Sequence, residues 1–274
     1  MNKKILITAE LDNESLEYLK NNFDVILTGR AAGASNFFSE DEMINEINKY
    51  EPEVLIISAD PITHKVIYSC NSVKLIIVTR GNPVNVDLKS CSEKNVIVTN
   101  TPSRNANCVA EMVIAMIINL SRNIFPSVEA VKNGKVSLKN IEDANKNTKD
   151  VIWSSKNLEV TPYLEYRGFD IEGKTLGLIG MGAIGKKVLK KALCLGMNIL
   201  VYDPYIDNFS EKDKIKKVDL GYLLKNSDFV SLHCKVTEET ENMISADELN
   251  EMKSTAYLIN TARGALIDTS ALVK

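Results

Sequence analysis

Three glycines in the second half of the chain have the spacing of a phosphate-binding turn. Gly180, Gly182 and Gly185 form the pattern G-x-G-x-x-G between an apolar run and an amphipathic one. In a strand–turn–helix context, the first glycine permits the tight turn, the second lets the backbone approach a pyrophosphate, and the third allows close packing of helix on strand. Free backbone N–H groups at Ala183 and Ile184 would then receive the phosphates at the helix N-terminus.

An acidic residue follows the next predicted strand. Asp203 ends the run NILVYD, about 20 residues beyond the first glycine, where an acid accepts hydrogen bonds from the adenosine ribose. This carboxylate would repel a 2′-phosphate, and the following Pro204 and Tyr205 offer no arginine to pair with one. The glycine pattern alone also fits an ordinary strand–helix turn, but together with Asp203 it predicts binding of NAD rather than NADP.

One arginine and two histidines complete the candidate chemistry. Arg263 follows the predicted strand AYLIN, and ligands of α/β proteins bind at the carboxyl ends of strands. The chain contains only two histidines, His64 and His233. This scarcity matters because histidine is the commonest acid–base group near neutral pH.

Alternating strands and helices must position these residues. Short β-branched runs alternate with helical stretches in the first hundred residues, and a second alternation starts at KTLGLIG and ends at AYLIN. Such alternation is typical of a parallel, doubly wound sheet. A capping box at Ser39 and Glu42 predicts one helix start, the apolar run from Asn107 predicts a long helix, and Gly196 is expected to end the helix after the glycine turn. The sequence therefore predicts two α/β sheets.

Composition excludes several classes of protein. The 274 residues are 45% hydrophobic and 25% charged, as in globular proteins, and are enough for two domains. The net charge of −3 predicts neither nucleic-acid nor membrane binding. No run approaches the ~18 apolar residues of a membrane span, and the N-terminus lacks a signal-peptide pattern. Five widely spaced cysteines indicate reduced thiols and no metal site. We therefore expect a cytoplasmic protein.

Several longer stretches carry a family resemblance. They are TRGNPVNVDL, VIVTNTPSRNANCVAEMV, GKTLGLIGMGAIGKKV, DFVSLHCKVTEET and MKSTAYLINTARGALID. In this order they resemble the D-isomer-specific 2-hydroxyacid dehydrogenases, most closely the phosphoglycerate dehydrogenase-like branch. The resemblance implies an α/β protein with a flavodoxin-like substrate domain, residues 1–106, and a Rossmann-like NAD-binding domain, residues 107–274, with the active site in the cleft between them.

The resemblance also implies roles for the substrate-binding residues. Arg263 matches an arginine that contacts the carboxylate and the carbonyl of a 2-oxo acid. A planar guanidinium can bridge both groups and stabilise the charge that develops as hydride arrives. Gly81 and Asn82 match backbone N–H groups that hold the substrate carboxylate. Arg104 fits either a contact to a substrate phosphate or a salt bridge beside the start of the long helix.

On the cofactor side, the resemblance adds residues from two further strand ends. His233 matches a position along the cofactor cleft, although an ordinary loop histidine fits the sequence equally well. Lys235 replaces the proline that is usual beside it, and His64 is expected at the surface. The expected cofactor-binding residues are Gly180, Gly182, Ala183, Ile184, Gly185, Asp203, His233, Thr261, Ala262 and Arg263.

The family's proton donor has no counterpart in this sequence. In the family it is a histidine backed by a glutamate, in segments that follow the Arg263 stretch, and the sequence ends at Lys274 before either. His233 is a poor substitute because it matches a position that lines the cofactor. We therefore expect a chain that is truncated at the C-terminus, with an incomplete Rossmann domain and little activity of its own.

Two functions from different classes follow. The first is an NAD-dependent oxidoreductase acting on a small D-2-hydroxy or 2-oxo acid of the phosphoglycerate or hydroxypyruvate/glyoxylate type. The alternative is a catalytically silent NAD-binding sensor or interaction protein on the same fold. The resemblance also implies a homodimer through the cofactor domain, with the helix at 107–124 in the contact. The polar segment 132–157, with Trp153, fits a surface loop or a subunit-contact arm.

Overall fold

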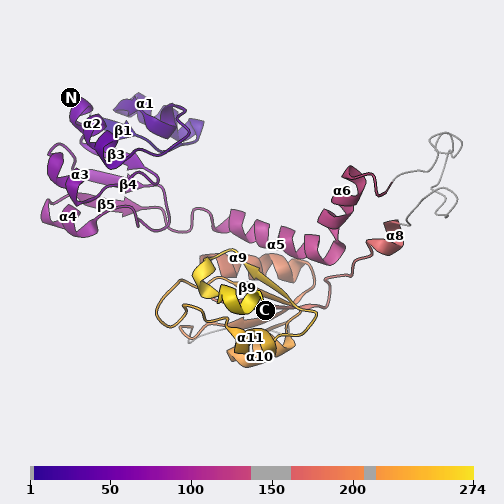
Figure 1. The fold of residues 1–274 in the computed structure, drawn as a ribbon. Helices are drawn as coiled ribbons and strands as arrows, with labels where there is room; N and C mark the ends of the chain where they lie inside the picture. The colour runs from indigo at the N-terminus through magenta and orange to yellow at the C-terminus, as the bar shows by residue number, and fades with distance from the viewer. Residues whose placement is uncertain (1–2, 137–161, 207–213) are drawn as a thin grey trace, which may run out of the picture. The chain divides into compact units, whose positions relative to one another are not determined.

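The chain forms two compact α/β units, Met1–Asn105 and Ala106–Lys274. The computed structural model describes residues 3–136, 162–206 and 214–274 (Figure 1). Trp153 and most of the polar segment 132–157 lie outside the described residues. Because each unit has its own sheet and its own core, each is described by itself.

The first unit is a five-stranded parallel sheet with the strand order β2-β1-β3-β4-β5. This is the flavodoxin-like order, so the predicted fold class of the unit is confirmed. The strands are β1 (Lys4–Ile7), β2 (Asp24–Leu27), β3 (Val54–Ile57), β4 (Leu75–Val78) and β5 (Ile97–Asn100). The helices are α1 (Asn13–Asn22), η1 (Gly29–Ala32), α2 (Glu40–Tyr50), α3 (His64–Ser69) and α4 (Leu88–Glu93).

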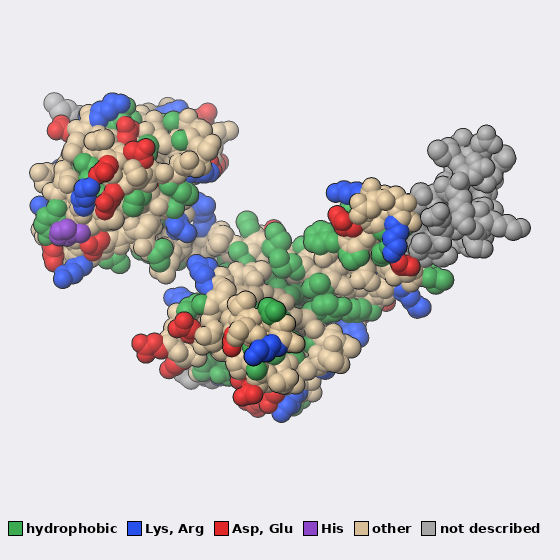
Figure 2. Space-filling model, viewed as in Figure 1, with side chains coloured by type: hydrophobic (Ala, Val, Ile, Leu, Met, Phe, Trp, Pro, Cys, Tyr) green, Lys and Arg blue, Asp and Glu red, His purple; other side chains and the backbone are tan. Residues whose placement is uncertain are grey.

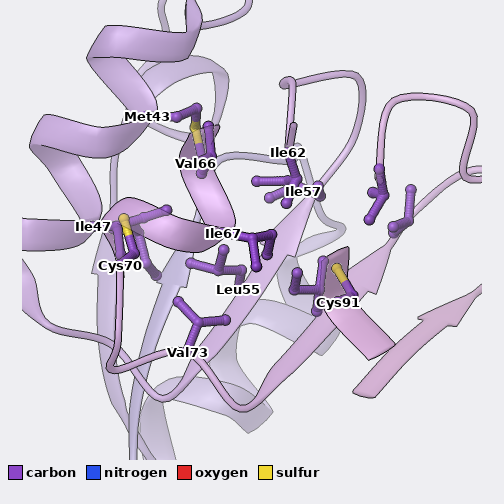
Figure 3. Packing of buried hydrophobic residues seen from close by; sticks show 14 residues of the cluster. Met43, Ile47, Leu55, Ile57, Ile62, Val66, Ile67, Cys70, Val73 and Cys91 are labelled. Carbon is purple, nitrogen blue, oxygen red and sulfur yellow. The ribbon is translucent and has the colours of Figure 1, made fainter. Parts of the chain in front are cut away.

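Apolar residues on both faces of this sheet explain why the unit folds. Along β3, Leu55 and Ile57 pack with Met43 and Ile47 of α2 on one face (Figure 3). Their neighbours on the strand belong to a separate cluster on the other face, because successive side chains of a strand point to opposite sides. The predicted capping box is confirmed, since Ser39 N–H donates to Glu42 Oε2 over 2.7 Å and Glu42 N–H donates to Ser39 Oγ.

The second unit is another five-stranded parallel sheet, with the order β10-β9-β6-β7-β8. Its strands are β6 (Thr175–Ile179), β7 (Asn198–Tyr202), β8 (Ile215–Lys217), β9 (Phe229–Leu232) and β10 (Tyr257–Asn260). Its helices are α5 (Ala106–Arg122), α6 (Ile124–Lys132), α8 (Pro162–Glu165), α9 (Ala183–Cys194), α10 (Leu220–Asn226), α11 (Ala246–Glu251), η2 (Gly264–Leu266) and α12 (Thr269–Leu272).

The strand order of this unit places a candidate site. From β6 the chain adds β7 and β8 on one side, and then returns to add β9 and β10 on the other. The carboxyl ends of β6 and β9 therefore flank the point where the order reverses, which is where ligands bind in open α/β sheets. This is the Rossmann-like arrangement that the sequence predicts.

Helix α5 differs slightly from the long helix that the sequence predicts. It ends at Arg122, and α6 starts at Ile124 after Asn123, whose φ of 53° is left-handed. One face of α5 packs against α9, and Lys191 donates to Glu111 over 3.1 Å at this contact. Within the described residues no single helix meets the length and hydropathy needed to cross a bilayer, and α5 with α6 does so only as a pair bent by 67°.

Candidate functional site

The first glycine of the turn is required by the fold itself. Gly180 has a φ of 95°, and a Cβ placed there would lie 2.8 Å from the backbone N of Cys234 and the backbone C of His233. Any side chain would therefore meet backbone that cannot move aside. The Gly180 N–H donates to the Tyr202 carbonyl over 2.9 Å, and the His233 N–H donates to the Ile179 carbonyl over 2.7 Å, so the turn is bonded to the ends of both β7 and β9.

The other two glycines meet opposite surroundings. A Cβ at Gly185 would lie 2.3 Å from the Gly180 carbonyl oxygen, so this glycine lets α9 pack directly on the turn. A Cβ at Gly182 would meet nothing within 4 Å. The fold therefore leaves open space at the one glycine expected to face a pyrophosphate.

The N-terminus of α9 has no side-chain cap. Gly182 is its N-cap residue, and the N–H groups of the first turn, including those of Ala183 and Ile184, have no acceptor within the helix. Six other helices of the described residues are capped by a side-chain oxygen, from Asp12, Ser39, Thr63, Asp87, Asp219 and Asp268. The donors and positive dipole end of α9 are thus left for an anion, which fits a phosphate group.

Asp203 is held against the glycine turn by backbone hydrogen bonds. Its Oδ2 accepts the Met181 N–H over 2.7 Å and its Oδ1 accepts the Tyr205 N–H over 2.9 Å. Each carboxylate oxygen accepts from a different segment, which fixes the orientation of the group and leaves further lone pairs on both oxygens. The geometry suits a carboxylate that receives ribose hydroxyls beside the turn.

His233 lies directly after β9 and is neutral near pH 7. Burial lowers the pKa of its imidazole to about 4. Ser231 Oγ lies 3.0 Å from Nε2, whereas Nδ1 is buried without a hydrogen-bond partner among the described residues. The hydroxyl of Thr261, directly after the neighbouring strand β10, is likewise buried and unpartnered. Two unsatisfied polar atoms at adjacent strand ends fit a site that a polar ligand completes.

Arg263 stands on a turn that Asn260 holds closed. Asn260 Oδ1 accepts the Ala262 N–H over 3.0 Å, and Asn260 Nδ2 donates to the Arg263 carbonyl over 2.7 Å. The guanidinium is exposed, donates to the Ala262 carbonyl over 2.8 Å, and forms no ion pair with a described carboxylate. The charge of Arg263 is therefore available to an anionic ligand.

The remaining predicted site residues belong to the first unit. Gly81 and Asn82 are exposed on the loop after β4, and the Gly81 carbonyl accepts a hydrogen bond from Asn100 Nδ2 over 2.8 Å. Arg104 is exposed and forms no ion pair within the described part of the chain. His64 is exposed, as predicted, and its ring lies 4.2 Å from that of Tyr68.

The sequence reasoning missed two asparagines. Asn100 and Asn260 each end the last strand of their sheet, and each braces a loop that carries predicted site residues. The repeated pair Asn-Thr at 100–101 and 260–261 was the available signal. Among the described residues, no group of three or more His, Cys, Asp or Glu side chains could hold a metal ion.

Comparison with known proteins identifies the family. Residues 114–274 match the family described as D-isomer specific 2-hydroxyacid dehydrogenase, NAD binding domain. Over 98% of its length, the chain is 33% identical to hydroxypyruvate reductase from Thermotoga maritima, of which it covers 77%. The chain therefore belongs to the D-isomer-specific 2-hydroxyacid dehydrogenase family, and its second unit is the NAD-binding domain of that family.

Two further comparisons show how much of the relatives the chain spans. It is 32% identical to D-3-phosphoglycerate dehydrogenase from Synechocystis over 98% of its own length, but it covers only 43% of that protein. A crystal structure from Thermus thermophilus aligns with a TM-score of 0.77 at 27% identity, covering 98% of this chain and 77% of the other.

Proposed function

We propose that this protein is an NAD-dependent oxidoreductase that interconverts a small D-2-hydroxy acid and its 2-oxo acid, of the phosphoglycerate or hydroxypyruvate/glyoxylate type. The observation that carries the proposal is the uncapped N-terminus of α9 behind Gly182, beside a carboxylate that Met181 N–H already orients. The names of the relatives support the substrate class. They do not favour the catalytically silent sensor.

The cofactor residues act by binding and orienting. Ala183 and Ile184 offer first-turn N–H groups to the pyrophosphate, and Asp203 accepts from ribose hydroxyls. The unpartnered atoms Thr261 Oγ1 and His233 Nδ1 give further polar contacts at the strand ends. When bound, the nicotinamide ring donates or accepts the hydride.

Arg263 is proposed as the catalytic arginine. Its exposed guanidinium, with no ion pair to a described carboxylate, can exchange its hydrogen bond to the Ala262 carbonyl for stronger ones to a 2-oxo acid. The same charge stabilises negative charge that develops on the carbonyl oxygen. The N–H groups of Gly81 and Asn82 are proposed to hold the carboxylate, and Arg104 a phosphate where the substrate carries one.

His233 is proposed to bind rather than to move a proton. Its pKa of about 4 leaves it neutral near pH 7, so it cannot act as the general acid when a 2-oxo acid is reduced. General acid catalysis contributes roughly 10²–10⁴-fold. We therefore propose that residues 1–274 alone bind cofactor and substrate but reduce 2-oxo acids slowly.

A homodimer through the second unit is also proposed. Along α5 and α6, several large apolar side chains are exposed, and Figure 2 shows apolar side chains gathered over these helices. They are Met112, Met116, Ile124, Phe125, Val128 and Val131. Contiguous exposed apolar surface of this kind marks interaction sites, and the family resemblance makes a second copy of the chain the expected partner.

Fluorescence titration with NADH, followed by turnover with glyoxylate, hydroxypyruvate, phosphohydroxypyruvate and pyruvate, tests the proposed function. The expected result is NADH binding and 2-oxo acid-dependent oxidation of NADH, slow for residues 1–274. Arg263→Gln should keep NADH affinity and lose binding of oxamate, a 2-oxo acid analogue that cannot be reduced. A protein that binds no NADH, or whose Arg263→Gln variant binds oxamate unchanged, contradicts the assignment.

A further inference from the structure

In the loop after β4, the consecutive carbonyl groups of Arg80 and Gly81 both accept hydrogen bonds from residues at the end of β5. The Arg80 carbonyl accepts the Thr101 N–H over 3.1 Å. The Gly81 carbonyl accepts a hydrogen bond from the side-chain amide of Asn100 over 2.8 Å. Two neighbouring peptide groups are therefore held by two neighbouring residues of another segment.

Fixing these carbonyls also fixes two N–H groups. In a planar trans peptide the N–H points away from the C=O of the same peptide group. The peptide that carries the Arg80 carbonyl also carries the Gly81 N–H, and the one that carries the Gly81 carbonyl carries the Asn82 N–H. Both N–H groups consequently point away from the end of β5, and neither donates to an acceptor among the described residues.

The fold around residue 81 would accommodate a side chain and does not require a glycine there. A Cβ there would lie 3.8 Å from the Ser103 N and 4.0 Å from the Thr101 carbonyl oxygen, which are ordinary contacts. Gly81 and Asn82 are both exposed, so the loop is accessible to a ligand. An anion that accepts from two adjacent backbone N–H groups needs both to be aimed in advance, since free peptides would lose orientation entropy on binding.

We propose that Asn100 is a positioning residue for recognition of the substrate carboxylate. Its amide holds the Gly81–Asn82 peptide so that the Asn82 N–H stands beside the Gly81 N–H as a second, pre-oriented donor. The proposal rests on the proposed function, because the anion it serves is the carboxylate of a 2-oxo acid. It assigns specificity to a side chain that need not touch the substrate.

The variants follow from the single bond that Asn100 makes to this loop. Asn100→Ala removes the amide, and Asn100→Asp keeps its shape but removes the donor. Asn198→Ala is the matched control, because Asn198 Nδ2 also donates to a glycine carbonyl, that of Gly173, over 2.8 Å, at the start of β7. All proteins are full chains saturated with NADH, and their unfolding temperatures are recorded.

The ligands separate positioning from general support of the loop. Oxamate presents a carboxylate, whereas oxamide has the same planar shape and no carboxylate. A charge-assisted hydrogen bond contributes more than a neutral one, so losing its orientation should weaken oxamate binding about tenfold. We expect this loss in both Asn100 variants, with NADH affinity, oxamide affinity and the Asn198→Ala protein unchanged within about twofold.

Each outcome decides the matter. Oxamate affinity that is equal in the parent, Asn100→Ala and Asn100→Asp proteins overturns the role of Asn100 while leaving the proposed function intact. Equal weakening of oxamate and oxamide overturns it as well, because a merely structural brace would act on both. A parent chain that binds NADH but no oxamate overturns the proposed function itself, and the role of Asn100 with it.

Discussion

The carboxylate of Asp203 accepts the backbone N–H of Met181 over 2.7 Å, so the end of β7 is bonded to the middle of the glycine turn. In the proposed function these two segments bind the ribose and the pyrophosphate of the cofactor. Their bond means that the negative charge of Asp203 is held in place before any cofactor arrives.

Cofactor choice should depend on this charge. Asp203→Asn keeps one acceptor oxygen and the shape of the side chain but removes the charge that would repel a 2′-phosphate. We expect the ratio of NADPH to NADH dissociation constants to fall by at least about tenfold, or ~1.4 kcal/mol. Fluorescence titration measures both constants, and Asp170→Asn, which removes an exposed carboxylate elsewhere in the unit, is the control. Equal affinity of the parent protein for both cofactors would refute the idea.

The two glycines Gly180 and Gly182 should fail in different ways. Gly180→Ala places a side chain at a residue with a left-handed φ and against the backbone of His233 and Cys234, which follow β9. We expect it to lower the free energy of unfolding by at least about 2 kcal/mol. Gly182→Ala meets open space and should leave stability almost unchanged while weakening NADH binding. Urea unfolding and NADH titration distinguish the two. A Gly182→Ala protein with parental NADH affinity would exclude close cofactor approach at this residue.

His233 should make stability depend on pH. Because burial lowers its pKa in the folded state from 6.5 to about 4, the unfolded state binds the extra proton first as pH falls. The contribution of His233 to the free energy of unfolding is therefore fully present above pH 6.5 and is lost as the pH falls from 6.5 to about 4. The total loss is about 3 kcal/mol at most.

Denaturant unfolding across this pH window measures the effect. His233→Gln should flatten the dependence, whereas His64→Gln, which removes the exposed histidine, should leave it in place. Parallel curves for the parent and the His233→Gln protein would show that the imidazole titrates alike in the folded and unfolded states.

Self-association should depend on the exposed apolar face of α5 and α6. Phe125 is 68% exposed, and Phe125→Glu would place a charge within that face. We expect a dimer by sedimentation velocity at micromolar concentration, with the dissociation constant raised at least about tenfold by this change. Tyr18→Glu, at a side chain of the first unit that is 65% exposed, is the control. A monomeric parent protein would rule out the dimer.

Structural features that depend on a few neighbouring residues could be predicted from the sequence. The capping box of Ser39 and Glu42, the end of α9 before Gly196 with its φ of 79°, and the three glycine positions all depend on local conformation. Short apolar runs that alternate with helical stretches likewise indicated both parallel sheets. A strand that is buried on both faces needs an apolar run, whichever strands it pairs with. Even so, β8 escaped notice, since its three residues IKK carry little apolar pattern.

The sequence by itself thus determined the family, the kind of sheets and the residues of the glycine turn. Only the tertiary structure decided that Asn100 braces Gly81, that Asn260 closes the Arg263 turn, and that His233 is buried enough to stay neutral. The physical reason is that the hydrogen-bond partner of an asparagine side chain is set by which group the fold places within hydrogen-bond distance. In the same way, the pKa of a histidine depends on how far the neighbouring strands exclude solvent from its ring. These properties arise from packing between segments that are far apart in the sequence, so local sequence patterns do not predict them.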